Sequence, residues 1–318
     1  MAKGYYLPDE ENILSRQWLK IVKKYEPLPE FPKIVQIQTK SGCNANCAFC
    51  PNYKTINKLS HGTMDMELFK KIIDECVRYP MKRISPYLMN EPLADKDICE
   101  KIAYITKVKK EPTYTKINTN ATFLDEEMAR KILDSGLDRI SISFHGITKE
   151  TYEKSMKGLN FEKNLRNVER FVELKNKGNY KKPRIRITMV HTNLNDKELD
   201  KIREFWRNRG LKINVHALEN RTSNAVERNS LNIKKWKRLS KCVRLMEQAY
   251  ILYNGDVLLC CVDWERSTVL GNLKKHSLYE VWNSEKYMKI RRAYYRNKTE
   301  GILCGKCLIQ DEEDFVMS

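Results

Sequence analysis

The sequence predicts an α/β fold whose main part is a partial (β/α)6 TIM-like barrel. From Lys33 to about Ala217, short β-rich runs alternate with amphipathic segments of helical length, which is the pattern of βα units repeated around a parallel sheet. Six such runs can be counted, whereas a closed barrel has eight strands, so we expect an open barrel. The length of 318 residues leaves room for one main domain and an appended part.

The expected strands and helices alternate along this region. The strands are expected at about 34–39, 82–88, 114–118, 138–144, 184–190 and 212–217. The helices are expected near 66–79, 96–108, 125–135, 161–177 and 197–208. The helix at 125–135 has clear end signals, because Asp125, Glu126 and Glu127 stand in its first turn and Gly136 follows it.

The rest of the chain divides into three further segments. Residues 1–32 are expected to form a helix and a proline-rich tether that pack outside the barrel at 33–218. The polar stretch 219–241 is expected to be a linker, and 242–318 a small C-terminal domain. Within that domain, Asn254-Gly255-Asp256 lies between two apolar runs and predicts a β-hairpin.

Composition excludes some classes of protein. No apolar run is about 18 residues long, so no membrane span is expected, and the N-terminus lacks the apolar core of a signal peptide. The ten cysteines therefore indicate metal ligands in a reducing cytoplasm. The net charge of +18 favours anionic partners such as phosphorylated metabolites, acidic peptides or nucleic acid. We favour a lysine-rich solvated surface over a nucleic-acid site, because the basic clusters lack regular aromatic stacking platforms.

Three cysteines form the most informative motif. Cys43-x3-Cys47-x2-Cys50 follows the first expected strand and brings three thiolates to one loop. A closed zinc site or an ordinary cubane cluster takes four protein ligands. The loop therefore leaves either an open metal position or a distant fourth ligand. With Phe49 directly before the third cysteine, it resembles the signature of the radical S-adenosylmethionine (SAM) superfamily, in which SAM chelates the fourth iron of a [4Fe-4S] cluster.

Other strand ends strengthen this resemblance. Met89-Asn90-Glu91-Pro92 resembles the motif that holds the SAM amino group, with Asn90 in place of the usual glycine. Thr119-Asn120-Ala121 is similar to the Thr-Asn-Gly of the family, and Gly62 and Met64 match a recurring segment. Such residues are expected at the carboxyl ends of barrel strands. The resemblance implies SAM contacts from Phe49, Asn90, Glu91, Thr119, Asn120 and Ser143, the last at the position that contacts the ribose.

A second group of cysteines lies after the barrel. Cys304-x2-Cys307 can close a four-ligand site with Cys242 and one thiol of the Cys260-Cys261 pair. Four thiolates suit Zn²⁺ as well as iron. The segment from Gly255 to Asp263 and those that follow it resemble the SPASM/twitch extension of radical SAM enzymes. The shorter twitch form implies one auxiliary [4Fe-4S] cluster, held by Cys242, Cys260, Cys304 and Cys307.

Several chemically capable side chains have plainer interpretations. Buried histidines are usually only hydrogen bonded, so His145 and His216 are expected to be structural. Cys76 and Cys99 fall within expected helices and are expected in the core. Successive side chains of an extended segment point to opposite faces, so Cys261 should face away from a cluster held by Cys260. Cys261 is then a core residue, which we favour, or a hydrogen donor in catalysis.

The resemblance implies an enzyme that reductively cleaves SAM to a 5′-deoxyadenosyl radical, which abstracts hydrogen from a substrate. An external electron donor such as flavodoxin or ferredoxin would supply the electron. We expect a small polar substrate, a sugar or an aminocyclitol, and oxidation or epimerisation as the outcome. A ribosomal peptide is the alternative, although residues 1–32 are too few for a winged leader-binding domain. A zinc-bearing nucleic-acid-binding protein is an alternative of a different class.

Overall fold

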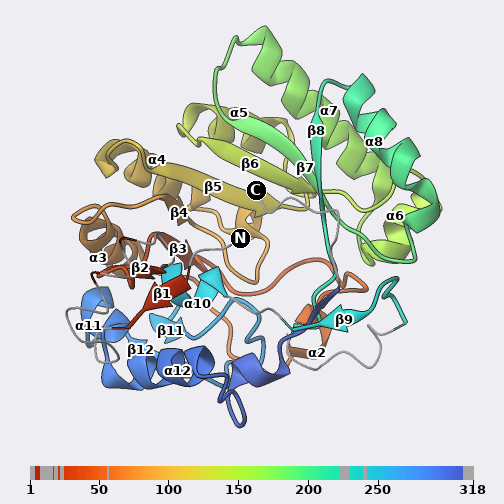
Figure 1. Cartoon of the computed structure of the whole chain (residues 1–318). Helices are drawn as coiled ribbons and strands as arrows, with labels where there is room; N and C mark the ends of the chain where they lie inside the picture. Colours follow the sequence, from red (N-terminus) through yellow and green to blue (C-terminus); the bar gives the residue numbers. More distant parts are fainter. Residues whose placement is uncertain are drawn as a thin grey trace.

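A nine-stranded sheet forms the centre of the molecule, in the order β12-β11-β10-β3-β4-β5-β6-β7-β8 (Figure 1). The computed structural model describes residues 4–7, 25–55, 57–221, 230–238 and 242–310, together with Gln17 and Ile21. Six consecutive strands of the sheet, β3 to β8, are parallel. They are β3 (Ile34–Ile37), β4 (Arg83–Ser85), β5 (Tyr114–Thr119), β6 (Arg139–Ser143), β7 (Arg184–Val190) and β8 (Lys212–His216).

The helices that connect these strands confirm the expected partial barrel. They are α3 (Met66–Cys76), α4 (Ile98–Val108), α5 (Glu126–Asp134), α7 (Phe161–Lys177) and α8 (Leu199–Asn208). The shorter elements are α2 (Asn52–Thr55), η1 (Pro92–Ala94), α6 (Lys149–Ser155) and η2 (Asp196–Glu198). Of these, the sequence pattern predicts none, because each is too short to show a helical period.

The two faces of each barrel strand differ sharply in polarity. Ile117, Ile140 and Ile187 point outward and pack with apolar residues of α4, α5, α7 and α8 in one buried cluster. The alternate positions, such as Lys116, Asn118 and Thr188, line a cavity inside the barrel. Because side chains alternate along a strand, this pattern fixes which face meets the helices and leaves a polar barrel interior.

The C-terminal part continues the barrel sheet. β10 (Gln248–Ile251) pairs in parallel with β3. The predicted hairpin joins β10 to β11 (Asp256–Leu258), and these two strands pair in antiparallel fashion. β12 (Val269–Asn272) completes the sheet. The remaining helices are α10 (Val243–Glu247), α11 (Leu278–Trp282), α12 (Glu285–Tyr295) and η3 (Leu303–Lys306). β3 lies before the expected domain boundary at residue 242 and β10 lies after it, so one sheet spans both expected domains. The division into two domains stays a prediction.

The segments outside the sheet are only partly described. β1 (Gly4–Tyr6) pairs with β2 (Tyr25–Pro27), and most of the expected helix in residues 1–32 lies outside the described residues. The Pro29 carbonyl accepts a 2.9 Å bond from Trp282 Nε1, so the tether packs on α11. The described part of the expected linker includes β9 (Trp236–Lys237), which pairs with β13 (Ile309–Gln310).

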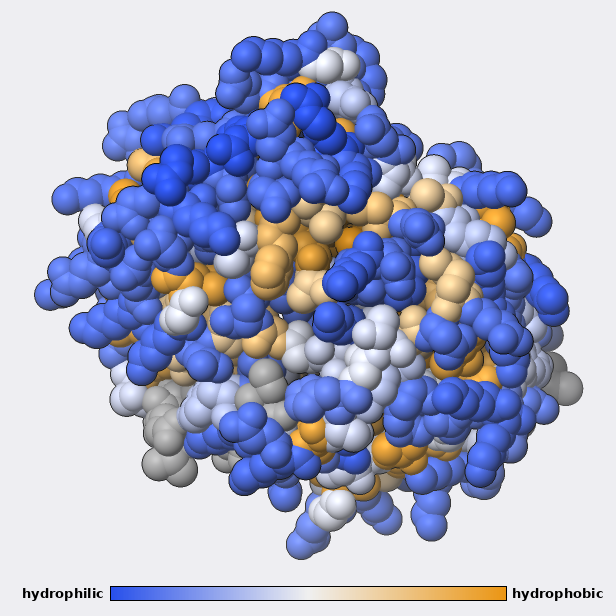
Figure 2. Space-filling model, turned by 180° about the vertical axis from the view of Figure 1, so that it is seen from behind, coloured by the Kyte–Doolittle hydropathy of each residue, from blue (hydrophilic) through white to orange (hydrophobic). Residues whose placement is uncertain are grey.

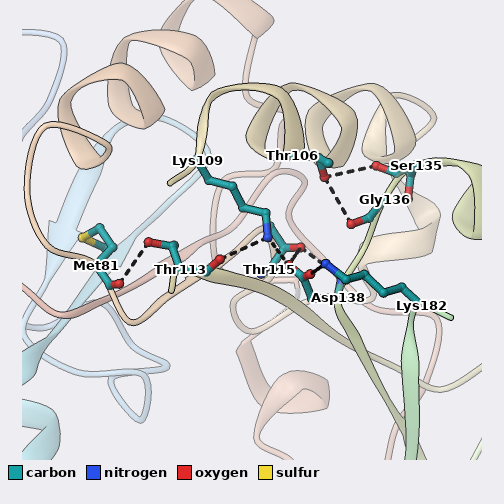
Figure 3. A network of polar contacts seen from close by, with 9 residues as sticks. All are labelled: Met81, Thr106, Lys109, Thr113, Thr115, Ser135, Gly136, Asp138 and Lys182. Atoms are coloured by element: carbon teal, nitrogen blue, oxygen red, sulfur yellow. Dashed lines mark hydrogen bonds and ion pairs between the residues drawn. The ribbon is translucent and has the colours of Figure 1, made fainter. Parts of the chain in front are cut away.

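A buried carboxylate ties the amino ends of the barrel strands together (Figure 3). Asp138, just before β6, accepts hydrogen bonds from Thr115 of β5 through its backbone N–H at 2.8 Å and its hydroxyl at 3.0 Å. Lys109 and Lys182 form ion pairs with the same carboxylate, one from each neighbouring connection. Burial alone would raise the pKa of Asp138, but these hydrogen bonds outweigh it and lower the pKa to about 2.

The surface is largely hydrophilic on the face seen in Figure 2, with a hydrophobic band near the centre and smaller hydrophobic patches elsewhere. Among the described residues, no helix has the length and apolar character needed to cross a membrane.

Candidate active site

One cavity inside the barrel brings together the residues that the sequence predicts for SAM and its cluster. Its volume is about 1830 Å³, counting the space that opens to solvent. The predicted residues in its wall are Cys43, Cys47, Phe49, Cys50, Asn90, Glu91, Thr119, Asn120 and Ser143. They come from the loops or ends of four adjacent strands, β3 to β6, as expected for a barrel site. Their individual roles stay predictions.

The cysteine loop is held by α6, an element absent from the sequence prediction. The backbone N–H of Asn46 donates to the Lys157 carbonyl at 2.8 Å, and that of Ala48 donates to the Ser155 carbonyl at 2.9 Å. On the other side, Asn52 Nδ2 donates to the Ala45 carbonyl at 3.2 Å. These bonds fix the backbone between the thiols, so the three sulfur atoms are positioned before any ligand binds.

Glu91 joins the end of β4 to the end of β5. Its buried carboxylate accepts hydrogen bonds from the Thr119 hydroxyl at 2.6 Å, the Asn120 N–H at 2.8 Å and the Leu93 N–H at 3.1 Å. Burial raises the pKa of Glu91 to about 7 in spite of these donors. An ammonium group beside it would favour the charged form, which fits the predicted contact with SAM.

Two asparagines of α7 support the end of β5, and the sequence prediction missed them. Asn164 Nδ2 donates to the Asn120 carbonyl at 3.2 Å, and Asn167 Nδ2 donates to the Ala121 carbonyl at 2.9 Å. Asn120 in turn donates to Asn44 Oδ1 in the cysteine loop at 2.9 Å. The signal was available, because Asn164 and Asn167 occupy the apolar stripe of α7 with Val168.

Two positions take a backbone conformation that favours glycine. Met89 has φ +51° and Ala121 has φ +63°, and both adjoin predicted SAM contacts. Ala121 stands where the resembled motif has glycine. The backbone keeps the left-handed conformation with alanine there, which is strained because alanine has a Cβ atom. A Cβ at Gly62 would lie 2.4 Å from the ring of Tyr253, so a larger residue there would displace that side chain.

Phe49 packs against His145, with ring centroids 4.5 Å apart. The His145 Nδ1 atom accepts a 2.9 Å hydrogen bond from the Val190 N–H, so the proton of the neutral ring lies on Nε2. Burial, with smaller effects from His216 and Arg221, lowers the pKa of His145 to about 3. His145 is therefore a neutral residue of the cavity wall that supports Phe49, consistent with the structural role expected from the sequence.

The three thiols of the cysteine loop fit an iron–sulfur cluster. Burial, and next the charge of Glu91, raise the pKa of Cys43 to about 12. Burial also raises the pKa of Cys47. Thiolates in such surroundings need a bound cation to compensate their charge. The set supplies three sulfur ligands next to an open cavity, which suits a cluster with one iron left for SAM.

The predicted auxiliary ligands surround a second, smaller pocket. Cys242, Cys260, Cys304 and Cys307 all line it, and its volume is about 440 Å³ including open space. Within the ranges that the structure describes, no three His, Cys, Asp or Glu side chains converge closely enough to hold a single metal ion. Four thiols around one pocket suit an iron–sulfur cluster or Zn²⁺.

The two cavities are neighbours, because Arg244 and Val262 line both. Cys260 lines the auxiliary pocket, whereas its neighbour Cys261 lines the barrel cavity. Cys261 is half-buried and packs against a buried apolar cluster that includes Tyr250, while it also lines the cavity, so the core and the donor interpretations both stay predictions. Arg244 lines both cavities and forms a two-bond ion pair with Glu219, one of the bonds being 3.0 Å long.

Comparison with known families decides the identity of this arrangement. Residues 37–206, more than half of the chain, match the model of the radical SAM superfamily. The chain belongs to the radical SAM superfamily. Residues 242–308 of this radical SAM protein match a second family model, SPASM, described as an iron–sulfur cluster-binding domain. All four predicted auxiliary ligands lie in that range, which favours iron over zinc at the second pocket.

Two curated relatives match most of this radical SAM protein. The tungsten-containing aldehyde ferredoxin oxidoreductase cofactor-modifying protein of Pyrococcus furiosus is 24% identical over 332 residues, covering 89% of each chain. The S-adenosyl-L-methionine-dependent 2-deoxy-scyllo-inosamine dehydrogenase of Niallia circulans is 21% identical over 294 residues, covering 89% of this chain and 96% of the relative. Streptococcus suis SuiB bound to the precursor peptide SuiA has a TM-score of 0.66 at 16% identity, over 87% of this chain and 69% of SuiB. That likeness shows a shared fold.

Proposed function

We propose that this radical SAM enzyme abstracts hydrogen from a small polar molecule, of the sugar or aminocyclitol kind, and so oxidises or epimerises it. The observation that supports the proposal is the meeting of the cysteine loop, Glu91, Asn120 and Cys261 in one cavity. The dehydrogenase from Niallia circulans, named for an inosamine, matches along nearly its whole length. The polar side chains of the cavity, such as Asn118 and Thr188, could bind the hydroxyl groups of such a compound.

The residues of the cavity have separate tasks in this proposal. Cys43, Cys47 and Cys50 hold a cluster that, when bound, supplies one electron for the cleavage of SAM to methionine and a 5′-deoxyadenosyl radical. Asn90 and Glu91 bind the SAM ammonium, and Ser143 binds the ribose. Phe49 covers the loop and helps to exclude water. Family members take electrons from an external reductant; we propose flavodoxin or ferredoxin, in the reducing cytoplasm.

SAM cleavage tests the first part of the proposal. The Cys43→Ala, Cys47→Ala, Cys50→Ala triple variant should form no 5′-deoxyadenosine under anaerobic reduction, because it lacks the ligands of the first cluster. Cys99→Ala is the matched control, since that thiol lies on α4 against Met128 and should leave cleavage intact. Continued formation of 5′-deoxyadenosine by the triple variant would show that the cluster lies elsewhere.

The outcome of the reaction depends on Cys261. In an epimerase, a thiol returns a hydrogen atom to the substrate radical, and Cys261 lines the cavity where this could occur. Cys261→Ala should then continue to cleave SAM while inverted product disappears. An unchanged product profile would favour oxidation with electron loss to a protein acceptor. Deuterium transfer into 5′-deoxyadenosine from labelled candidates, small molecules and peptides alike, would separate the small substrate from the peptide alternative raised by the likeness to SuiB.

A further inference from the structure

The inner face of the barrel is strongly basic. The six strands β3 to β8 contain six Lys or Arg residues and, in their described ranges, no Asp or Glu. The basic residues are Arg83, Lys116, Arg139, Arg184, Arg186 and Lys212. The strand register puts them on one face, since Lys116 lies opposite Arg139, Arg139 opposite Arg184, and Arg186 opposite Lys212. The basic residues thus occupy positions on the same face of the five strands β4 to β8.

Two of these cations line the cavity, and neither forms an ion pair with another residue that the structure describes. Arg83 and Lys116 both stand in its wall. The Arg83 Nε atom is buried and has no hydrogen-bond partner. Two other members of the set have partners, because the Arg139 guanidinium lies 3.7 Å from the centre of the Tyr114 ring and Arg186 donates to Asn214 at 3.0 Å. A buried polar group without a partner costs free energy, so the Arg83 guanidinium would gain from an acceptor at this position in the cavity.

The carboxylates of the cavity are engaged elsewhere. Glu91 accepts bonds from Thr119 and Asn120, and Glu219 pairs with Arg244. Burial, and then the charges of Arg83, Arg139 and Arg186, lower the pKa of Lys116 to about 8. Burial and Lys116 also lower the pKa of His216 in the same wall. The protein therefore concentrates positive charge at this end of the cavity without neutralising it.

The cationic pair lies deeper than the residues predicted to bind SAM. Lys116 precedes Thr119 by three residues on β5, which places it roughly 10 Å below the carboxyl end of that strand. Arg83 begins β4, whereas Glu91 follows that strand. The amide side chains of Gln36, Asn118 and Gln248 line the same cavity. This inner end thus offers two cations and several amide groups, separate from the loop that holds the thiols.

We infer that the substrate of this enzyme carries an oxyanion, a phosphate or a carboxylate, which Arg83 and Lys116 bind at the inner end of the cavity. The inference rests on the proposed function and narrows its substrate class to an acidic, hydroxylated small molecule. Arginine and lysine recognise phosphate and carboxylate through charge-assisted hydrogen bonds. A substrate whose only charge is an ammonium group would be repelled here.

Anion binding to the full-length, anaerobically reconstituted protein tests the inference. The probes are inorganic phosphate and succinate, titrated separately by calorimetry with SAM present at saturation. Saturable binding of one probe identifies the oxyanion as phosphate or carboxylate. Arg83→Gln and Lys116→Gln should each weaken that binding at least tenfold. Lys82→Gln is the matched control, because Lys82 adjoins Arg83 but is exposed and lies outside the cavity. The affinity of the Lys82→Gln variant for the probe should equal that of the wild type.

The outcomes separate this inference from the proposed function. Absence of saturable binding with both probes overturns the inference, as does binding that survives both substitutions. Formation of 5′-deoxyadenosine by the wild-type protein is measured in parallel and depends on the cysteine loop. Wild-type cleavage of SAM without anion binding would reject the oxyanion site alone, whereas anion binding without cleavage would reject the proposed function alone.

Discussion

Glu91 combines two tasks in one buried side chain. It holds the end of β5 through Thr119 and Asn120, and it faces the cavity in which SAM is proposed to bind. A carboxylate has about four positions that accept hydrogen bonds, and three are used by protein donors. One acceptor position is left for the SAM ammonium.

Glu91→Gln should weaken SAM binding roughly tenfold or more, because a charge-assisted hydrogen bond contributes about 1.5–3 kcal/mol. Equilibrium binding of SAM to protein with both clusters assembled would measure the effect. Glu100→Gln on α4, which is exposed, should bind SAM normally. Equal affinity for SAM in the wild type and in Glu91→Gln would mean that Glu91 only holds the end of β5 in place.

Lys116 illustrates a cost of the basic cavity. Its pKa is about 8 in the folded protein against 10.5 ordinarily, so the charged form is disfavoured by folding. At pH 7, Lys116→Gln should therefore raise the free energy of unfolding, by about 3 kcal/mol. Between pH 8 and 10.5 the unfolded chain holds a proton that the folded chain lacks, so the wild type gains stability and the difference should shrink. Denaturant unfolding at pH 7 and pH 10 would check this, and Lys82→Gln should change little at either pH.

At the scale of elements, the barrel itself could be predicted and its supports could not. The strand and helix periods gave β5, β7 and α7 almost to the residue, because each is long enough to show its pattern. β4 is shorter than expected, since Pro86 follows it and cannot donate to the sheet. α6 was missed because it is too short to show a helical period. The polar residues in the apolar stripe of α7 were visible in the sequence, but their hydrogen-bond partners lie in loops that are distant in sequence.

The Asp138 network is an element-scale device, since it joins β5, β6 and the connections before β5 and β7. Its carboxylate has a pKa of about 2 in the folded protein against 3.8 ordinarily, so the charged form is favoured by folding. Asp138→Asn should lower the free energy of unfolding by about 2 kcal/mol at pH 7, because the pKa of Asp138 falls by nearly two units on folding. The loss should diminish as pH falls from about 4 to 2, where the wild type also becomes protonated. Thermal unfolding across that range would measure it, with exposed Asp200→Asn on α8 as the control.

On the scale of the whole molecule, the two thiol sites depend on one sheet. β3 leads to the cysteine loop, and its neighbour β10 leads through the hairpin to Cys260 and Cys261. The parallel pairing of β10 with β3 joins residues more than 200 positions apart, and no local pattern predicts such a contact. The ligand sets could still be proposed from the sequence, because cysteine spacing and family resemblance do not depend on knowing the topology.

Iron content should distinguish the two adjacent cysteines. Two [4Fe-4S] clusters imply about eight iron atoms per chain. Cys260→Ala should reduce this to about four, because Cys260 lines the auxiliary pocket, whereas Cys261→Ala should retain about eight. Iron analysis of anaerobically purified protein would decide, and the reverse pattern would make Cys261 the ligand.

The position of β10 has a consequence for how this chain can be divided. An open barrel has two free borders, and without β10 the residues Ile34–Ile37 of β3 would present bare N–H and C=O groups to solvent. A short apolar strand in that state is a template for edge-to-edge association with other chains. The C-terminal part thus covers the edge of β3 and protects the barrel from aggregation, independently of any cluster that it holds. A fragment that ends at residue 241 would lose β10, which covers this edge, together with the second thiol site.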